Sequence, residues 1–162
     1  MKELIIGKSW EGILTRIACV SCFIIFFVYP NFDIIRVDGH SMTPTFDNEE
    51  VVFLKKYAYE HIPPELDDVV VLKGEPNKLI LREKLIKRIV GIPGDKIEIK
   101  AGYLYVNDII HMPELGVIFK HLDYVFVEKI PEDHYFYIGD NRADTMYGLV
   151  NRNEITGKIM FN

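Results

Sequence analysis

The stretch Val37-Asp38-Gly39-His40-Ser41-Met42-Thr43-Pro44-Thr45-Phe46 decides how the rest of the chain is interpreted. It follows a β-branched pair at 34–35, which is typical of a strand. Gly39 allows a positive φ, and Pro44 fixes a turn dihedral. This layout predicts that the Ser41 hydroxyl lies at the exposed end of a strand. Taken alone, the stretch is better explained as an ordinary strand and turn, in which Ser41 only helps to form the turn.

Two later blocks change that balance. The first is Lys-Arg-Ile-Val-Gly-Ile-Pro-Gly-Asp at 87–95, and the second is Gly-Asp-Asn-Arg at 139–142. Together with Gly39–Thr45, which reads Gly-x-Ser-Met-x-Pro-Thr, they resemble in order and spacing the three sequence blocks of the type I signal peptidases. These are membrane-anchored serine proteases with a Ser–Lys dyad. Three matching blocks over most of the chain are a far more specific signal than any one of them.

The resemblance assigns roles to individual residues. It implies that Ser41 is the nucleophile and Lys87 the general base, and that Arg88 and Asp140 form an ion pair that supports the lysine strand. Gly39 occupies the position at which part of the family has a serine that donates to the oxyanion. The backbone N–H of Ser41 is then the best candidate donor, and the second donor stays open. The resemblance implies no metal and no cofactor.

The residues themselves leave the choice of base open. A serine hydroxyl needs a base to become a nucleophile. The chain has five histidines, and His40, next to Ser41, would point to the opposite face if both lay in a strand. A lysine can serve only when it is neutral, which burial favours. Lys87 is flanked in its strand by Ile86, Ile89 and Val90. A lysine in an apolar strand also fits an exposed edge that resists aggregation.

The chain departs from the family after Arg142, where its third block is about four residues shorter than the family's. If the deletion follows Thr145, this residue replaces the family serine whose hydroxyl orients the lysine. If the deletion precedes Asp144, the Asp144–Thr145 pair replaces a later Asp–Ser pair, and the lysine loses that partner. We therefore treat Thr145 as a candidate for the residue that orients Lys87.

The N-terminal region predicts a membrane anchor. Residues 17–29 are almost entirely apolar, and residues 13–15 extend this run toward the roughly 20 residues that span a bilayer, provided that Arg16 reaches the headgroups. No small-x-small cleavage site follows, which argues against a removed signal peptide. Basic residues precede the run, so the positive-inside bias places the N-terminus in the cytoplasm.

These signals divide the chain into two parts. We expect residues 1–31 to form a cytoplasmic tip and a single transmembrane anchor in the cytoplasmic membrane. Residues 32–162 then form an extracytoplasmic catalytic domain. Only about a dozen residues separate the anchor from Ser41, so the serine lies near the membrane surface, because extended chain covers at most ~3.6 Å per residue.

Beyond the anchor the pattern predicts an all-β fold. Short β-branched or aromatic runs alternate with turn signals, which favours antiparallel sheets over β-α-β units. The resemblance implies folded antiparallel sheets, or a partly open barrel, of the signal peptidase type. The predicted strands lie at 50–55, 68–72, 85–90, 96–100, 103–106, 124–127 and 134–138, and 79–87 is ambiguous between helix and strand.

Composition limits the partners. The 162-residue chain has a formal net charge of -5 and no basic run, which argues against nucleic-acid binding. Cys19 and Cys22 are spaced like a redox or metal motif, but both lie inside the apolar run, so we interpret them as small apolar side chains. Membrane lipid is an expected partner, and the oligomeric state is left open.

The resemblance also indicates substrates. Preproteins with a signal peptide, carrying small residues at the first and third positions before the cut, are expected to bind in extended form along two strand edges. One edge precedes Ser41 and includes Ile34, Ile35, Val37 and Asp38; the other precedes Lys87 and includes Leu85 and Ile86.

Three alternatives remain at this stage. One is a specialised peptidase that matures conjugation pilins, and another is an inactive membrane scaffold. A third, the self-cleaving SOS-repressor type of Ser–Lys protease, is disfavoured by the apolar run and by the absence of a basic DNA-binding region in the sequence.

Overall fold

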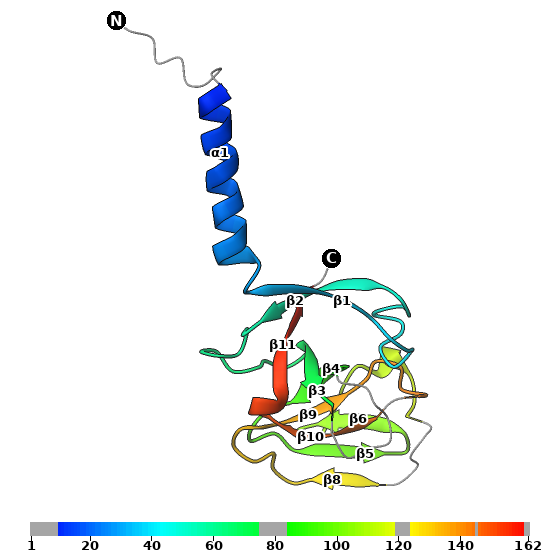
Figure 1. Ribbon diagram of the computed structural model, residues 1–162. Helices are drawn as coiled ribbons and strands as arrows, with labels where there is room; N and C mark the ends of the chain where they lie inside the picture. Colours follow the sequence, from blue (N-terminus) through cyan, green and yellow to red (C-terminus); the bar gives the residue numbers. More distant parts are fainter. Residues whose placement is uncertain (1–9, 75–83, 119–123, 145, 161–162) are drawn as a thin grey trace, which may run out of the picture.

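The structure is a computed structural model, and it describes residues 10–74, 84–118, 124–144 and 146–160. A single N-terminal helix extends away from a body of antiparallel strands (Figure 1). Neither of the two sheets closes into a barrel among the described strands. The all-β prediction with one N-terminal apolar helix is confirmed, in the form of folded sheets.

The helix α1 spans Trp10–Phe23 and continues as a π-helical segment over Ile24–Val28. Within the combined 19 residues an 18-residue window has a mean hydropathy of 2.0, and in the described ranges this is the one helix long and apolar enough to cross a membrane. None of the α1 side chains is buried against the strands. An apolar helix with no protein partner along its length has the properties of a membrane-spanning segment.

The larger sheet has seven strands in the order β1-β2-β11-β3-β4-β9-β10, and all of the pairs are antiparallel. Its strands are β1 Phe32–Arg36, β2 Val51–Lys56, β3 Val69–Lys73, β4 Lys84–Gly91, β9 His134–Ile138, β10 Tyr147–Asn151 and β11 Ile155–Met160. A 3₁₀ turn over Arg152–Glu154 joins β10 to β11 and is closed by a capping box. The strand β1, which follows the helix, is outermost at one side of this sheet.

The smaller sheet has four strands in the order β7-β6-β5-β8. They are β5 Ile97–Lys100, β6 Tyr103–Val106, β7 Ile109–Ile110 and β8 Val125–Val127, and a 3₁₀ turn at Pro113–Leu115 follows β7. Figure 1 shows this sheet at the end of the molecule opposite to the helix. The smaller sheet is therefore remote from the predicted membrane.

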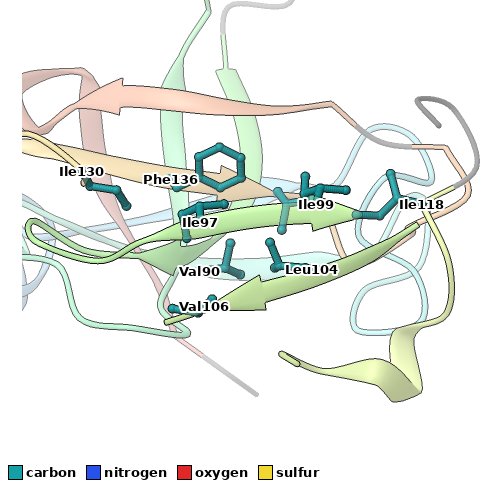
Figure 2. Close-up of a cluster of buried hydrophobic side chains, with 9 residues drawn as sticks. Val90, Ile97, Ile99, Leu104, Val106, Ile118, Ile130 and Phe136 are labelled. Carbon is teal, nitrogen blue, oxygen red and sulfur yellow. The ribbon is translucent and has the colours of Figure 1, made fainter. Parts of the chain in front are cut away.

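Three clusters of buried side chains hold the sheets together. The first core joins the small sheet to β4 and β9 (Figure 2) and consists of Val90, Ile97, Ile99, Leu104, Val106, Ile118, Ile130, Phe136 and Ile138. The second core consists of Val37, Met42, Phe46, Val52, Leu54, Val69, Val71 and Ile159. The third core consists of Tyr59, Val70, Leu72, Ile89, Tyr135, Val150 and Ile155.

The central strands β3 and β4 belong to more than one core. β3 reads Val-Val-Val-Leu-Lys, and its first four residues are buried because alternate side chains enter the second and third cores on opposite faces. β4 pairs with β3 and is buried from Lys87 to Gly91. Lys87 and Arg88 are thus both buried in the middle of β4.

The predicted strands correspond to β2, β3, β4, β5, β6, β8 and β9, with ends that differ by at most a residue or so. The ambiguous segment is a strand where it is described, from Lys84 onward. The sequence reasoning did not predict β10 or β11. Gly148 and Gly157 interrupt their apolar patterns, and a Cβ atom on Gly157 would lie 2.5 Å from the Lys55 carbonyl oxygen, so β11 requires a glycine there.

Candidate active site

Ser41 lies in a loop of bends and turns between β1 and β2. The loop is anchored to the body of the protein, because the side chains of Val37, Met42 and Phe46 all pack in the second core. The Phe46 N–H donates to the Met42 carbonyl at 3.0 Å and closes a turn beyond the serine. Ser41 is therefore held partly exposed on a loop whose neighbouring side chains are fixed in the core.

Lys87 faces this serine from the middle of β4. It lies opposite Val70 in the β3–β4 register, and it is only 2% exposed. Its Nζ donates to Ser41 Oγ at 2.6 Å, although the two residues are 46 positions apart in the chain. This distance is within the range over which a proton can pass directly between a base and a nucleophile. Burial of an amine also disfavours its charged form.

Arg88 and Asp140 form a buried ion pair behind the lysine. Arg88 Nε and Nη2 donate to the two oxygens of the Asp140 carboxylate at 2.8 and 2.6 Å, and Asp140 is 0% exposed. Burial alone lowers the pKa of Arg88, but the hydrogen bond and charge of Asp140 raise it overall. The Thr45 hydroxyl also donates to Asp140. This bidentate pair therefore connects β4 both to the segment after β9 and to the serine loop.

Further charges surround this ion pair. Arg88 Nη1 donates to the Asp67 carbonyl at 2.9 Å, and His111 Nε2 lies 3.1 Å from Asp67 Oδ1. Burial lowers the pKa of His111, and it also lowers that of Arg142, which is 2% exposed. Since His111 follows β7, the cluster links the small sheet to β4 through polar contacts as well as through the first core.

Two asparagines fix the backbone of the serine loop. Asn48 Oδ1 accepts from the Gly39 N–H at 2.8 Å. Asn141 contacts the loop twice: its N–H donates to the Ser41 carbonyl at 3.1 Å, and its Nδ2 donates to the His40 carbonyl at 3.0 Å. The sequence reasoning gave neither residue a role. The position of Asn141 within the Gly-Asp-Asn-Arg block was the signal that could have identified it.

The two strand edges predicted to bind the substrate are only partly accessible. Ile34 and Asp38 are exposed, whereas Val37 is buried in the second core. The Val37 N–H and C=O already pair with the backbone of Glu50 and Glu49, so this residue adds no open edge for a ligand. Leu85 and Ile86 are half-buried. The registered pairs between β4 and β9 begin at Arg88↔Ile138, so β9 does not cover the part of β4 that precedes Lys87.

His40 lies in a turn and not in a strand, so strand alternation does not apply to it; its side chain is exposed. Gly39 has φ 100°, the region that favours glycine, as its position before the turn predicted. Thr145 lies outside the described residues, and its orienting role stays a prediction.

Comparisons with known proteins place the chain in a family. The family model "Signal peptidase, peptidase S26" matches residues 8–162. Signal peptidase I of Bacillus caldolyticus is 30% identical over 172 residues, covering 96% of this chain and 89% of that protein. Signal peptidase I S of Bacillus subtilis strain 168 is 36% identical over 143 residues, covering 77% and 73%.

Two more relatives extend the comparison. Signal peptidase IB of Staphylococcus aureus strain N315 is 31% identical over 168 residues and covers 90% of this chain and 85% of that protein. A crystal structure of a signal peptidase I from Enterococcus faecalis V583 overlaps with a TM-score of 0.47 at 20% identity, over 60% of this chain and 97% of that one. The family match and the sequence relatives carry the assignment: the chain belongs to the signal peptidase family, peptidase S26, and is an enzyme of the signal peptidase I type.

Proposed function

We propose that the protein is a membrane-anchored serine endopeptidase that removes signal peptides from exported preproteins, with Ser41 as nucleophile and Lys87 as general base. The observation that carries this proposal is the 2.6 Å contact between Ser41 Oγ and the Nζ of a lysine that is only 2% exposed. A solvated lysine would stay protonated, because its free pKa is about 10.4. A buried one is suited to accept a proton.

In the acylation step, neutral Lys87 takes the proton from Ser41 Oγ as this oxygen attacks the carbonyl carbon before the cut. The tetrahedral intermediate carries its negative charge on the former carbonyl oxygen, which accepts a hydrogen bond from the Ser41 N–H. The peptide C–N bond then breaks. The leaving amine takes the proton from the Lys87 ammonium, and the mature protein departs with a free N-terminus.

Deacylation repeats the same proton transfers with water. Lys87, neutral again, removes a proton from a water molecule that attacks the ester carbon. The second tetrahedral intermediate collapses, and Ser41 Oγ leaves with the proton that Lys87 returns. The signal peptide is released with a carboxyl terminus. One base thus serves both steps, and no metal or cofactor enters the scheme.

The substrate is proposed to add its backbone to two strand edges. β1 is outermost in the large sheet, and it leads through Asp38 toward Ser41. On the other side, the β4 segment that includes Leu85 and Ile86 is not covered by β9. An extended peptide that pairs with these edges would present its scissile carbonyl to Ser41. The main chain then supplies affinity, and small side-chain pockets supply specificity.

Membrane attachment is proposed from two features of the described residues. The first is the apolar helix Trp10–Val28, and the second is an exposed apolar face that begins close to its end. In this face Ile34 of β1 lies opposite Phe53 of β2, and Phe53 lies opposite Met160 of β11. Three exposed apolar side chains in one cross-strand row favour contact with lipid. The site would then work at the membrane surface, where a signal peptide leaves the bilayer.

The proposed topology predicts the side of the membrane on which the catalytic domain lies. A reporter fused after the C-terminal residue should be active outside the cytoplasm, because basic residues precede the apolar segment. Two reporter fusions, one active only in the cytoplasm and one active only outside it, measure the location of the C-terminus directly. A cytoplasmic C-terminus would contradict the topology, since exported substrates would be out of reach.

The function itself is tested by incubating the purified protein with a preprotein in detergent and sequencing the N-terminus of the product. We expect one cut at the end of the signal peptide, after a residue with a small side chain. A preprotein with a bulky residue at that position is the matched control and should stay intact. No cleavage under any condition would favour the inactive scaffold, and cleavage confined to a pilin precursor would favour the specialised peptidase.

A further inference from the structure

The peptide unit between His40 and Ser41 is held by an unusual number of hydrogen bonds on one side. The His40 carbonyl oxygen accepts from the Thr43 N–H at 3.2 Å, from the Thr43 hydroxyl at 2.8 Å and from Asn141 Nδ2 at 3.0 Å. A carbonyl oxygen has two lone pairs, so three donors saturate it. This oxygen is tied both to its own turn and to the segment that follows β9.

The other end of the same peptide unit is the Ser41 N–H. The His40–Ser41 bond is trans, so its C=O and N–H lie in one plane and point in opposite directions. Any group that fixes the carbonyl therefore fixes the direction of the N–H. Within the described parts of the chain, the Ser41 N–H donates to no acceptor of its own. It is left available for a ligand.

Neighbouring contacts prevent the plane from rotating. The Gly39 N–H is held by Asn48, and the Ser41 carbonyl is held by the Asn141 N–H. The residue before Asn141 is the buried Asp140, which Arg88 holds in place. The position of Asn141 is thus fixed by its neighbour Asp140, and its side chain in turn fixes the position of the serine loop.

We infer that Asn141 and Thr43 are positioning residues of the oxyanion hole: through the His40 carbonyl they aim the Ser41 N–H at the substrate oxygen. They also strengthen it as a donor, because hydrogen bonds to a C=O polarise the amide and make its N–H more positive. The inference rests on the proposed function, in which this N–H receives the oxyanion. The family pattern leaves the position of Thr43 unspecified, so its hydroxyl is a feature of this chain.

Thr43 offers a matched pair of substitutions. Thr43→Val keeps the shape of the side chain but removes the hydroxyl donor, whereas Thr43→Ser keeps the donor. We expect Thr43→Val to lower kcat about 5- to 10-fold with little change in KM, and Thr43→Ser to stay within about 2-fold of wild type. Loss of an entire oxyanion donor typically costs about 10²–10³ in kcat, and a misaligned donor should cost only part of that.

Asn141 provides the second arm. Asn141→Ala removes the Nδ2 donor and keeps the backbone N–H, and we expect kcat to fall at least about 10-fold. Asn141→Asp keeps the size but places an acceptor against the His40 carbonyl, so it should be no better than alanine. The dependence of kcat/KM on pH should be the same in all of these variants as in wild type, because the proposed base, Lys87 Nζ, and its contact with Ser41 Oγ are unchanged.

A transition-state analogue separates positioning from general damage. A peptide aldehyde forms a hemiacetal with Ser41 Oγ, and its oxygen occupies the oxyanion position, whereas the corresponding peptide alcohol does not. In wild type the aldehyde should bind more tightly than the alcohol. In Thr43→Val and Asn141→Ala this advantage of the aldehyde, measured as the ratio of the two inhibition constants, should shrink about 10-fold. Thr156→Val removes a comparable bond, from the Thr156 hydroxyl to the Val71 carbonyl at 2.9 Å in β11, and should change neither kcat nor the ratio.

The outcomes are distinguishable. If wild type cleaves the preprotein and Ser41→Ala does not, but Thr43→Val and Asn141→Ala keep full kcat and an unchanged ratio, the inference is wrong and the proposed function stands. If Thr43→Ser is as impaired as Thr43→Val, the hydroxyl is not the relevant group, and the inference is also overturned. If Ser41→Ala retains activity, the proposed function itself fails.

Discussion

Replacing Ser41 by alanine should lower the rate of preprotein cleavage at least about 10⁴-fold. Loss of the nucleophile in a serine protease leaves only what binding and the oxyanion donors contribute. The measurement is kcat/KM for a preprotein in detergent, with Ser21→Ala in the apolar helix as the matched control, which should be unchanged. Activity of Ser41→Ala close to that of wild type would show that another group attacks the substrate.

Lys87→Ala should be as inactive as Ser41→Ala, because the two side chains act as one unit and their effects do not add. Lys84→Ala is the matched control: Lys84 lies in the same strand, is exposed, and should tolerate the change. The double variant with both Ser41 and Lys87 replaced should be no worse than either single variant. A further loss in the double variant would indicate independent roles.

The predicted role of Thr145 belongs to the same test of the base. Thr145→Val should lower activity about 10-fold, since it would remove the predicted hydrogen bond to Lys87, and such a bond is worth about 0.5–1.5 kcal/mol, or more where the lysine is charged. Thr145→Ser keeps the hydroxyl and should be close to wild type. If Thr145→Val is silent and Asp144→Ala is harmful, the other alignment of the shortened block is the right one.

Asp140→Asn should have the largest effect on stability. The Asp140 carboxylate is fully buried and accepts hydrogen bonds from two nitrogens of Arg88. It also interacts electrostatically with the buried guanidinium of Arg142. Neutralising one partner leaves a buried guanidinium uncompensated, which typically lowers the free energy of unfolding by about 3–5 kcal/mol. For a domain of this size that corresponds to a fall in Tm of about 10 °C or more.

The control for this prediction is an ion pair at the surface. Arg36 and Glu49 are 2.8 Å apart, with side chains 66% and 60% exposed. Glu49→Gln should change the free energy of unfolding by less than about 1 kcal/mol, because solvent screens exposed pairs. Thermal unfolding of both variants in the same detergent makes the comparison. Equal melting temperatures for Asp140→Asn and wild type would mean that the buried pair does not support the lysine strand.

The residues proposed for catalysis could be named from the sequence through the resemblance of three blocks to the signal peptidases, and the local surroundings of both residues agree with that assignment. Ser41 is followed by a proline turn, and Lys87 has Ile86 and Ile89 beside it in an apolar strand. Both features are encoded within a few positions of the residue concerned. What the pattern could not give is their contact, which depends on how β4 pairs with β3 and on how the serine loop folds over the second core.

The polar network around the serine was not predictable in the same way. Asn48, Thr43 and Asn141 are short polar residues in turn-rich segments, where such residues usually only form the turn. Their contacts join residues up to 101 positions apart, as between Asn141 and His40. Likewise, β11 was missed because its glycine is required by the close approach of β2, a tertiary constraint that alternation alone does not reveal.

The Ser41–Lys87 pair is tested most directly by the pH dependence of cleavage in wild type and in Lys87→Arg. For wild type, log kcat/KM should rise with a slope of about one as Lys87 loses its proton, and then reach a plateau. Lys87→Arg should stay at background at every pH, because a guanidinium keeps its proton throughout this range. Substantial activity in Lys87→Arg, or the same rising limb, would contradict the assignment of Lys87 as the base.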